Sequence, residues 1–86
     1  MAIKDLITDM YVEMEYMEHN IDTMSFEEIH IMLNNFEFHY KLANEKHAYT
    51  YLDDETKSSL TSVLVHAFSF RKRFYNKLMD IRVCLA

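Results

Sequence analysis

The chain has 86 residues, a net charge of −5 and a hydrophobic content of 50%, with six phenylalanines and six tyrosines. It contains neither glycine nor proline, although average composition would supply about ten of the two together. This composition excludes a largely disordered chain, and the missing turn residues argue against an all-β fold. Its length fits one domain, so we expect a single helical domain spanning residues 1–86.

Residues 3–20 are predicted to form the first helix. Apolar side chains recur there at steps of three and four residues, at Ile3, Ile7, Met10, Met14, Met17 and, just beyond, Ile21. This spacing is typical of a helix that turns one face to a core. Because no glycine is available, we expect Asn20 to end the helix in the left-handed conformation.

A second helix is predicted over residues 26–48. Ser25 stands three residues before Glu28, which is the spacing of a capping box. The core stripe continues at Ile29, Leu33, Phe36, Tyr40, Ala43 and His47, and a second apolar set (Ile31, Phe38 and Leu42) lies on another face. A helix that is apolar on two faces is usually sandwiched or meets a partner. Asn34 and Asn35 weaken the middle, and the pattern leaves open whether the helix breaks there.

The third helix is predicted over residues 54–84. Asp53 or Asp54 is suited to cap its first turn. Its core stripe consists of Leu60, Val63, Ala67, Phe70, Phe74, Leu78, Ile81 and Leu85. A second apolar row, Leu64, Phe68, Tyr75 and Met79, runs beside that stripe.

Three helices with short links predict an all-α fold, a compact three-helix up-down-up bundle with a long third helix. At ~1.5 Å per residue the third helix is about 45 Å long, against roughly 28 and 35 Å for the others. About residues 79–86 should therefore project beyond the bundle. Apolar side chains on such an overhang need cover, which a second copy of the chain would supply, so we expect a homodimer.

Charge is unevenly distributed along the chain. Residues 1–20 hold one lysine and five acidic residues, whereas residues 60–86 hold five basic residues and only Asp80. One interpretation makes Arg71, Lys72, Arg73 and Lys77 contacts for a nucleic acid, with neighbouring aromatic rings as stacking platforms. The favoured interpretation is that the basic run complements an acidic corner of the same bundle, formed by Glu13, Glu15, Glu18, Glu27 and Glu28.

The sequence offers no set of residues typical of catalysis. Glu27 with His30 has the Glu-x-x-His spacing, but helical di-iron sites need two such pairs and two further carboxylates, so neither a metal site nor a cofactor is predicted. No glycine exists to build a phosphate-binding loop or a nucleophile elbow, and we expect no enzyme. His39 and His47 stand two turns apart, as in a proton-sensitive strip, although half-exposed positions on a helical face are the commoner explanation.

Features of location point to the cytoplasm. Cys84 is the only cysteine, so no intramolecular disulfide forms. The N-terminal residues carry charges that do not fit a secretory signal. The longest uncharged run, residues 58–70, is too short for a membrane span, and no membrane partner is expected.

By elimination, the sequence predicts a small helical protein-binding module that acts by occupying a protein partner, as an adaptor or inhibitor does. Its size and composition suit a viral (phage) or accessory-element protein. The expected partner-binding residues are Phe38, Leu64, Phe68, Tyr75, Met79 and Ile81. The alternative is an RNA- or DNA-binding protein that uses the basic, aromatic end of the third helix.

Overall fold

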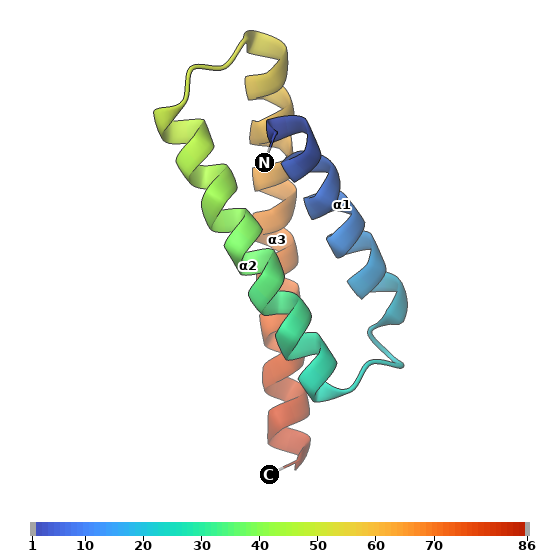
Figure 1. The fold of residues 1–86 in the computed structure, drawn as a ribbon. Helices are drawn as coiled ribbons and strands as arrows, with labels where there is room; N and C mark the ends of the chain where they lie inside the picture. The colour runs from blue at the N-terminus through green and yellow to red at the C-terminus, as the bar shows by residue number, and fades with distance from the viewer. Residues whose placement is uncertain (1, 86) are drawn as a thin grey trace.

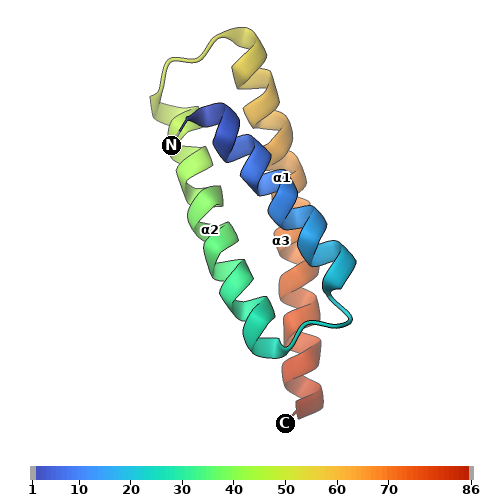
Figure 2. The same cartoon turned by 45° about the vertical axis from the view of Figure 1, so that its right-hand side comes forward.

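The computed structural model describes the backbone of residues 2–85 and the side chains of residues 2–79. It contains three helices, α1 (Ile3–Asn20), α2 (Phe26–Tyr49) and α3 (Asp54–Leu85), and each predicted boundary agrees to within one residue. Consecutive helices run in opposite directions, and all three pairs of helices are in contact (Figures 1 and 2). The predicted three-helix bundle is confirmed.

Side-chain caps fix the starts of α2 and α3. The Glu28 amide donates to the Ser25 hydroxyl oxygen at 3.1 Å, as the capping-box spacing predicts. At α3 the cap is Asp53, whose Oδ1 accepts from the Thr56 amide at 2.7 Å. Both caps satisfy amides that have no partner inside their helix.

The prediction that Asn20 adopts a left-handed conformation is wrong. No residue in the described chain has a positive φ, and Ile21, which follows α1, keeps helical angles of −55° and −37°. The Asn20 carbonyl accepts from the amides of Thr23 and Met24, both at 3.0 Å. Because this right-handed turn already satisfies that carbonyl, no left-handed residue is needed to end the helix.

The core is made for the most part by the stripes that the sequence predicts, although Leu6 beside the first stripe is buried and the predicted stripe residues Ile3, Ile7, Ile21, Tyr40 and His47 are only half-buried. Its fully or nearly fully buried side chains are Leu6, Met10, Met14 and Met17 of α1; Ile29, Leu33, Phe36 and Ala43 of α2; and Leu60, Val63, Ala67, Phe70, Phe74 and Leu78 of α3. Aromatic rings occupy its centre, where Phe36 meets Phe70 edge-on at 4.9 Å between ring centroids. No polar side chain of residues 2–79 is buried.

The long helices remain continuous. α2 passes through Asn34 and Asn35 without a break, which settles the alternative left open by the sequence. α3 is the longest, with 32 residues, and its C-terminal end extends past the other two helices (Figures 1 and 2). The longest extent of the molecule is 47 Å. The side chains of the overhang after Met79, including Ile81 and Leu85, lie outside the described residues.

Candidate interaction surface

A row of apolar side chains follows α3 beside its groove with α2. We call Leu64, Phe68, Tyr75 and Met79 the α3 row. Phe68 is 62% exposed and Met79 is 59% exposed. Tyr75 is 38% exposed, and Leu64 is half-buried. Four such residues on one flank of a helix arise from the spacing of three and four residues that the sequence shows.

Leu64 and Phe68, which form the N-terminal half of the α3 row, border a shallow hollow of 350 Å³ that we call the upper hollow. Asn44 and His47 of α2 form one side, and Leu64, Val65 and Phe68 of α3 form the other. The sequence of α3 from residue 58 to residue 70 contains no Asp, Glu, Lys or Arg. This part of the surface is therefore apolar and poor in charge, as are the centres of protein interfaces.

A polar bridge crosses the groove at its middle. The guanidinium of Arg71 donates to both carboxylate oxygens of Glu37, with 2.9 Å from Nη2 to Oε2, and its Cζ lies 4.3 Å from the centroid of the Tyr40 ring. The hydrogen bonding with Glu37 raises the pKa of Arg71. Burial, and then the charge of Glu37, raise the pKa of Tyr75. The bridge thus holds a fixed charge pair between two apolar stretches.

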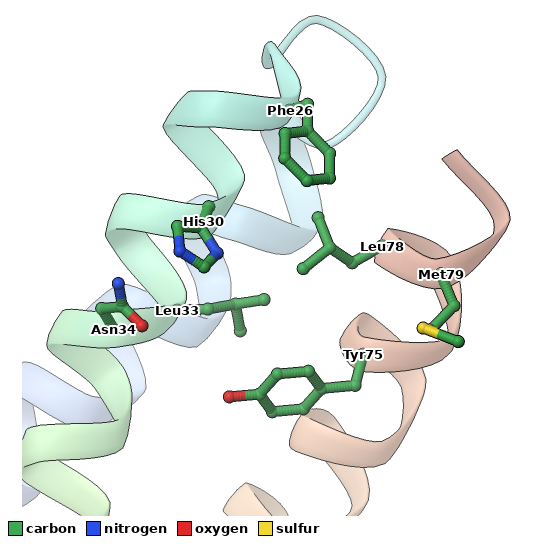
Figure 3. A pocket seen from close by; sticks show the side chains of 7 residues that line it. All are labelled: Phe26, His30, Leu33, Asn34, Tyr75, Leu78 and Met79. Carbon is green, nitrogen blue, oxygen red and sulfur yellow. The ribbon is translucent and has the colours of Figure 1, made fainter. Parts of the chain in front are cut away.

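A second hollow, of 360 Å³, lies beyond the bridge toward the C-terminal end of α3, and we call it the lower hollow. Phe26, His30, Leu33 and Asn34 of α2 face Tyr75, Leu78 and Met79 of α3 across it (Figure 3). The rings of Phe26 and His30 are parallel to within 2°, with centroids 6.3 Å apart. The structure thus joins the lower half of the α3 row to the first turns of α2, a pairing that the sequence pattern alone does not specify.

Phe38 does not lie with the α3 row, although the sequence groups it with the partner-binding residues. The residue before it, Glu37, contacts Arg71 of α3, and the residue after it, His39, contacts Glu13 of α1. Since successive helical residues are about 100° apart, Phe38 lies between the side of α2 that faces α3 and the side that faces α1, and it points outward. It is 67% exposed on the outer face of α2. The side chain of Ile81 lies outside the described residues, and its contribution remains a prediction.

Three of the four basic residues considered for nucleic-acid contact make ion pairs within the bundle. Arg71 pairs with Glu37, Arg73 with Glu18 at 2.8 Å, and Lys77 with Asp22 at 3.4 Å. Lys72 is exposed and pairs with no residue in the described part of the chain. Of the neighbouring rings, those of Phe70 and Phe74 are buried in the core and offer no stacking surface.

The partners of this basic run differ from the expected acidic corner. Of the five glutamates in that corner, only Glu18 pairs with it, while Glu37 and Asp22 were not anticipated. The reason is the position of each residue along the bundle. Arg71 stands beside the middle of α2, and Lys77 reaches the link after α1.

Three of the five histidines make contacts between helices. His39 Nδ1 lies 2.7 Å from Glu13 Oε1, His47 Nε2 lies 2.9 Å from the Thr61 hydroxyl, and His66 Nδ1 lies 3.0 Å from the Tyr11 hydroxyl. His39 and His47 therefore face α1 and α3 respectively, and they do not form one strip. No group of three or more potential metal ligands occurs among the described residues.

Several exposed apolar residues had no place in the sequence prediction. Val65 is 62% exposed, and Val12 and Tyr16 of α1 and Tyr49 and Tyr51 near the α2–α3 link are also exposed. Val65 falls one residue outside the α3 row, so period alone assigns it to solvent. Helical spacing makes it a neighbour of Leu64 and Phe68, but only the packing of α2 against α3 places it at the upper hollow.

Comparisons with known proteins give no functional lead. The chain matches no protein-family model, and searches of curated proteins and of solved structures also return no match. Within residues 2–85, none of the three helices combines the length and the apolar character needed to cross a membrane.

Proposed function

We propose that this chain is a protein-binding module that acts by occupying a protein partner through the exposed side of the α2–α3 groove. The single observation that carries the proposal is the position of Phe68 and Val65. Both are 62% exposed, and they stand side by side at a hollow in the charge-free stretch of α3 from residue 58 to residue 70. Exposed apolar groups clustered in this way mark interaction sites more often than isolated ones do.

The kind of partner follows from the surface. An apolar helix face or loop of another protein fits a shallow apolar hollow whose rim carries only neutral or weakly basic groups, such as Asn44 and His47. We include a second copy of this chain among such partners, and we place the module in the cytoplasm as an adaptor or inhibitor from a phage or other accessory element.

The rival function, RNA or DNA binding by the basic end of α3, is supported less well. Phosphate binding would have to compete with the ion pairs of Arg71, Arg73 and Lys77, and only Lys72 is available without such competition among the described basic residues considered. The loss of affinity with salt separates the two functions, because affinity for nucleic acid falls steeply as phosphate contacts are screened.

The test compares two double variants as baits in extracts of the source cells, after nuclease treatment. Val65→Glu with Phe68→Glu places charge on the proposed surface. Val12→Glu with Tyr16→Glu places the same charge on the outer face of α1, at side chains that are also more than half exposed. We expect the wild type and the α1 variant to retain the same protein partner at low and at raised salt, and the α3 variant to lose it. Equal retention by both variants, or release by salt alone, would contradict the proposal.

A further inference from the structure

The hollow at the lower end of the α2–α3 groove is built differently from the upper one. Leu33 and Leu78 are buried core residues that form its floor. The parallel rings of Phe26 and His30 form a flat wall on α2. Tyr75 reaches across from α3 with its hydroxyl directed toward α2 (Figure 3). A floor of aliphatic carbon beside a flat aromatic wall favours a planar guest.

Polar groups at the edge of this hollow are available to a ligand. Neither the His30 ring nor the Asn34 amide forms a side-chain hydrogen bond with any residue whose side chain is described. The Tyr75 hydroxyl also interacts with the Glu37 carboxylate, so a ligand can use the His30 ring, the Asn34 amide and the remaining acceptor capacity of that hydroxyl. None of the described lining side chains is a carboxylate, lysine or arginine, and the nearby Glu37 carboxylate is already paired with Arg71, so a charged guest would lose hydration against apolar walls without gaining a new ion pair from the described residues.

From this arrangement we infer that the hollow is a binding site for a flat, uncharged heteroaromatic ring of the size of indole or a purine. Its volume of 360 Å³ lies in the range of small-ligand sites, about 300–1,000 Å³. The ring lies against Phe26 and His30, and its nitrogen atoms exchange hydrogen bonds with Asn34 and the Tyr75 hydroxyl. The exposed thioether of Met79 flanks the mouth, where sulfur makes favourable contacts with aromatic edges.

The test measures binding of indole and of N-acetyl-tryptophanamide to the purified chain with no other protein present, so its result is separate from that of the bait experiment. Because the chain contains no tryptophan, fluorescence excited at the red edge of indole absorption reports only on the probe. We expect saturable binding, with amide shifts in nuclear magnetic resonance spectra confined to residues near 26–34 and 75–79. Equal binding of both probes indicates that the site accepts a ring attached to a peptide, and binding of indole alone indicates a free ligand.

Matched variants make the inference falsifiable. His30→Ala removes half of the aromatic wall and should weaken binding about 3- to 10-fold, and Tyr75→Phe, which keeps the ring and removes only the hydroxyl, should weaken it by a similar factor. Glu27→Ala, an exposed change in the same turn of α2, and Val12→Ala on the outer face of α1 should leave binding unchanged. Failure of both probes to saturate, or equal affinity of wild type, His30→Ala and Tyr75→Phe, would overturn the inference.

Discussion

Arg71 joins α3 to α2 through two kinds of contact. Its guanidinium binds the Glu37 carboxylate with two hydrogen bonds and lies over the Tyr40 ring. Both side chains of the ion pair are 29% exposed, so water screens it only in part. Such a pair contributes more than a freely solvated one, and its geometry suits arginine rather than lysine. The basic run is therefore tied into the fold at Arg71.

Reversal of Arg71 and Arg73 to glutamate should destabilise the fold. The change breaks the pairs with Glu37 and Glu18 and adds repulsion, for a combined loss of about 1–2 kcal/mol in the free energy of unfolding. The loss should shrink in high salt, because screening weakens attraction and repulsion alike. Urea denaturation at two salt concentrations measures both effects.

Compensating changes provide the control for this reversal. Adding Glu37→Arg and Glu18→Arg to the double variant should restore part of the lost stability, because opposite charges again face each other. If the Arg71 and Arg73 reversal instead left the melting temperature unaltered and abolished retention of nucleic acid, the basic run would bind phosphates.

The cap residue Asp53 predicts a pH dependence. Hydrogen bonds from Thr56, first from its side chain and then from its backbone amide, lower the pKa of Asp53 below 3.8. A carboxyl with a depressed pKa in the folded state contributes stability above its ordinary value, and that contribution is lost as the pH falls through the folded pKa. The cap should therefore weaken below about pH 4.

The measurement compares the melting temperatures of the wild type and Asp53→Asn between about pH 2 and pH 6. Asparagine also caps a helix but does not titrate, so the advantage of the wild type should be present at the upper end and fade toward the acidic end. A difference between the two proteins that stays constant over this range would show that the charge of Asp53 adds nothing to the cap.

Helix α2 illustrates how packing overrides weak local preference. Asn34 and Asn35 are poor helix formers in its middle, yet the helix continues because Leu33 and Phe36 on either side are buried in the core. Burial of such side chains is worth roughly 1.5–3 kcal/mol each, which exceeds the cost of two asparagines, about 0.7 kcal/mol each relative to alanine. The helix is held by its apolar face.

Asn35→Ala should consequently stabilise the protein. Asn35 is exposed and outside both hollows, so the change removes only its unfavourable helix propensity. We expect the free energy of unfolding to rise by about 0.5 kcal/mol with an unchanged urea m-value. Glu45→Ala, at another exposed position of α2, serves as the reference for a surface change to alanine. A loss of stability in Asn35→Ala would reveal a contact of this side chain that outweighs its propensity.

The extension of α3 beyond α1 and α2 affects how whole molecules associate. In the sequence, Ile81 and Leu85 continue the spacing of the core stripe toward the C-terminal end of α3, and that end extends past the other two helices (Figures 1 and 2). Apolar residues without cover favour association with a second copy. The α3 row, which points to the same side as the groove, offers further apolar area to such a contact.

Sedimentation at micromolar concentration should therefore give about twice the monomer mass of 10.4 kDa. Ile81→Glu should shift the protein toward monomer, because a buried unpaired carboxylate is costly at an apolar contact. Val12→Glu on the outer face of α1 should leave the mass unchanged. A wild-type protein that sediments as a 10.4 kDa monomer at every concentration tested would exclude this dimer.

Local sequence patterns predict the three helices, their boundaries and most of the core residues. These features depend on local information: apolar residues spaced by three and four, and caps such as Ser25 and Asp53 that lie within one turn of the amides they bind. The exception was the backbone conformation that ends α1. There the backbone found partners through a right-handed turn after Asn20, which side-chain preferences do not reveal.

The surfaces that the helices form together depend on how the helices pack. The rotation of each helix about its axis and its shift along the bundle place Arg71 opposite Glu37, turn Phe38 away from the α3 row, and bring Phe26 and His30 opposite Tyr75. A period of 3.6 residues identifies a face but not the face it meets, because many combinations of rotation and shift bury the same stripe. The ion pairs and both hollows therefore had to come from the packed molecule.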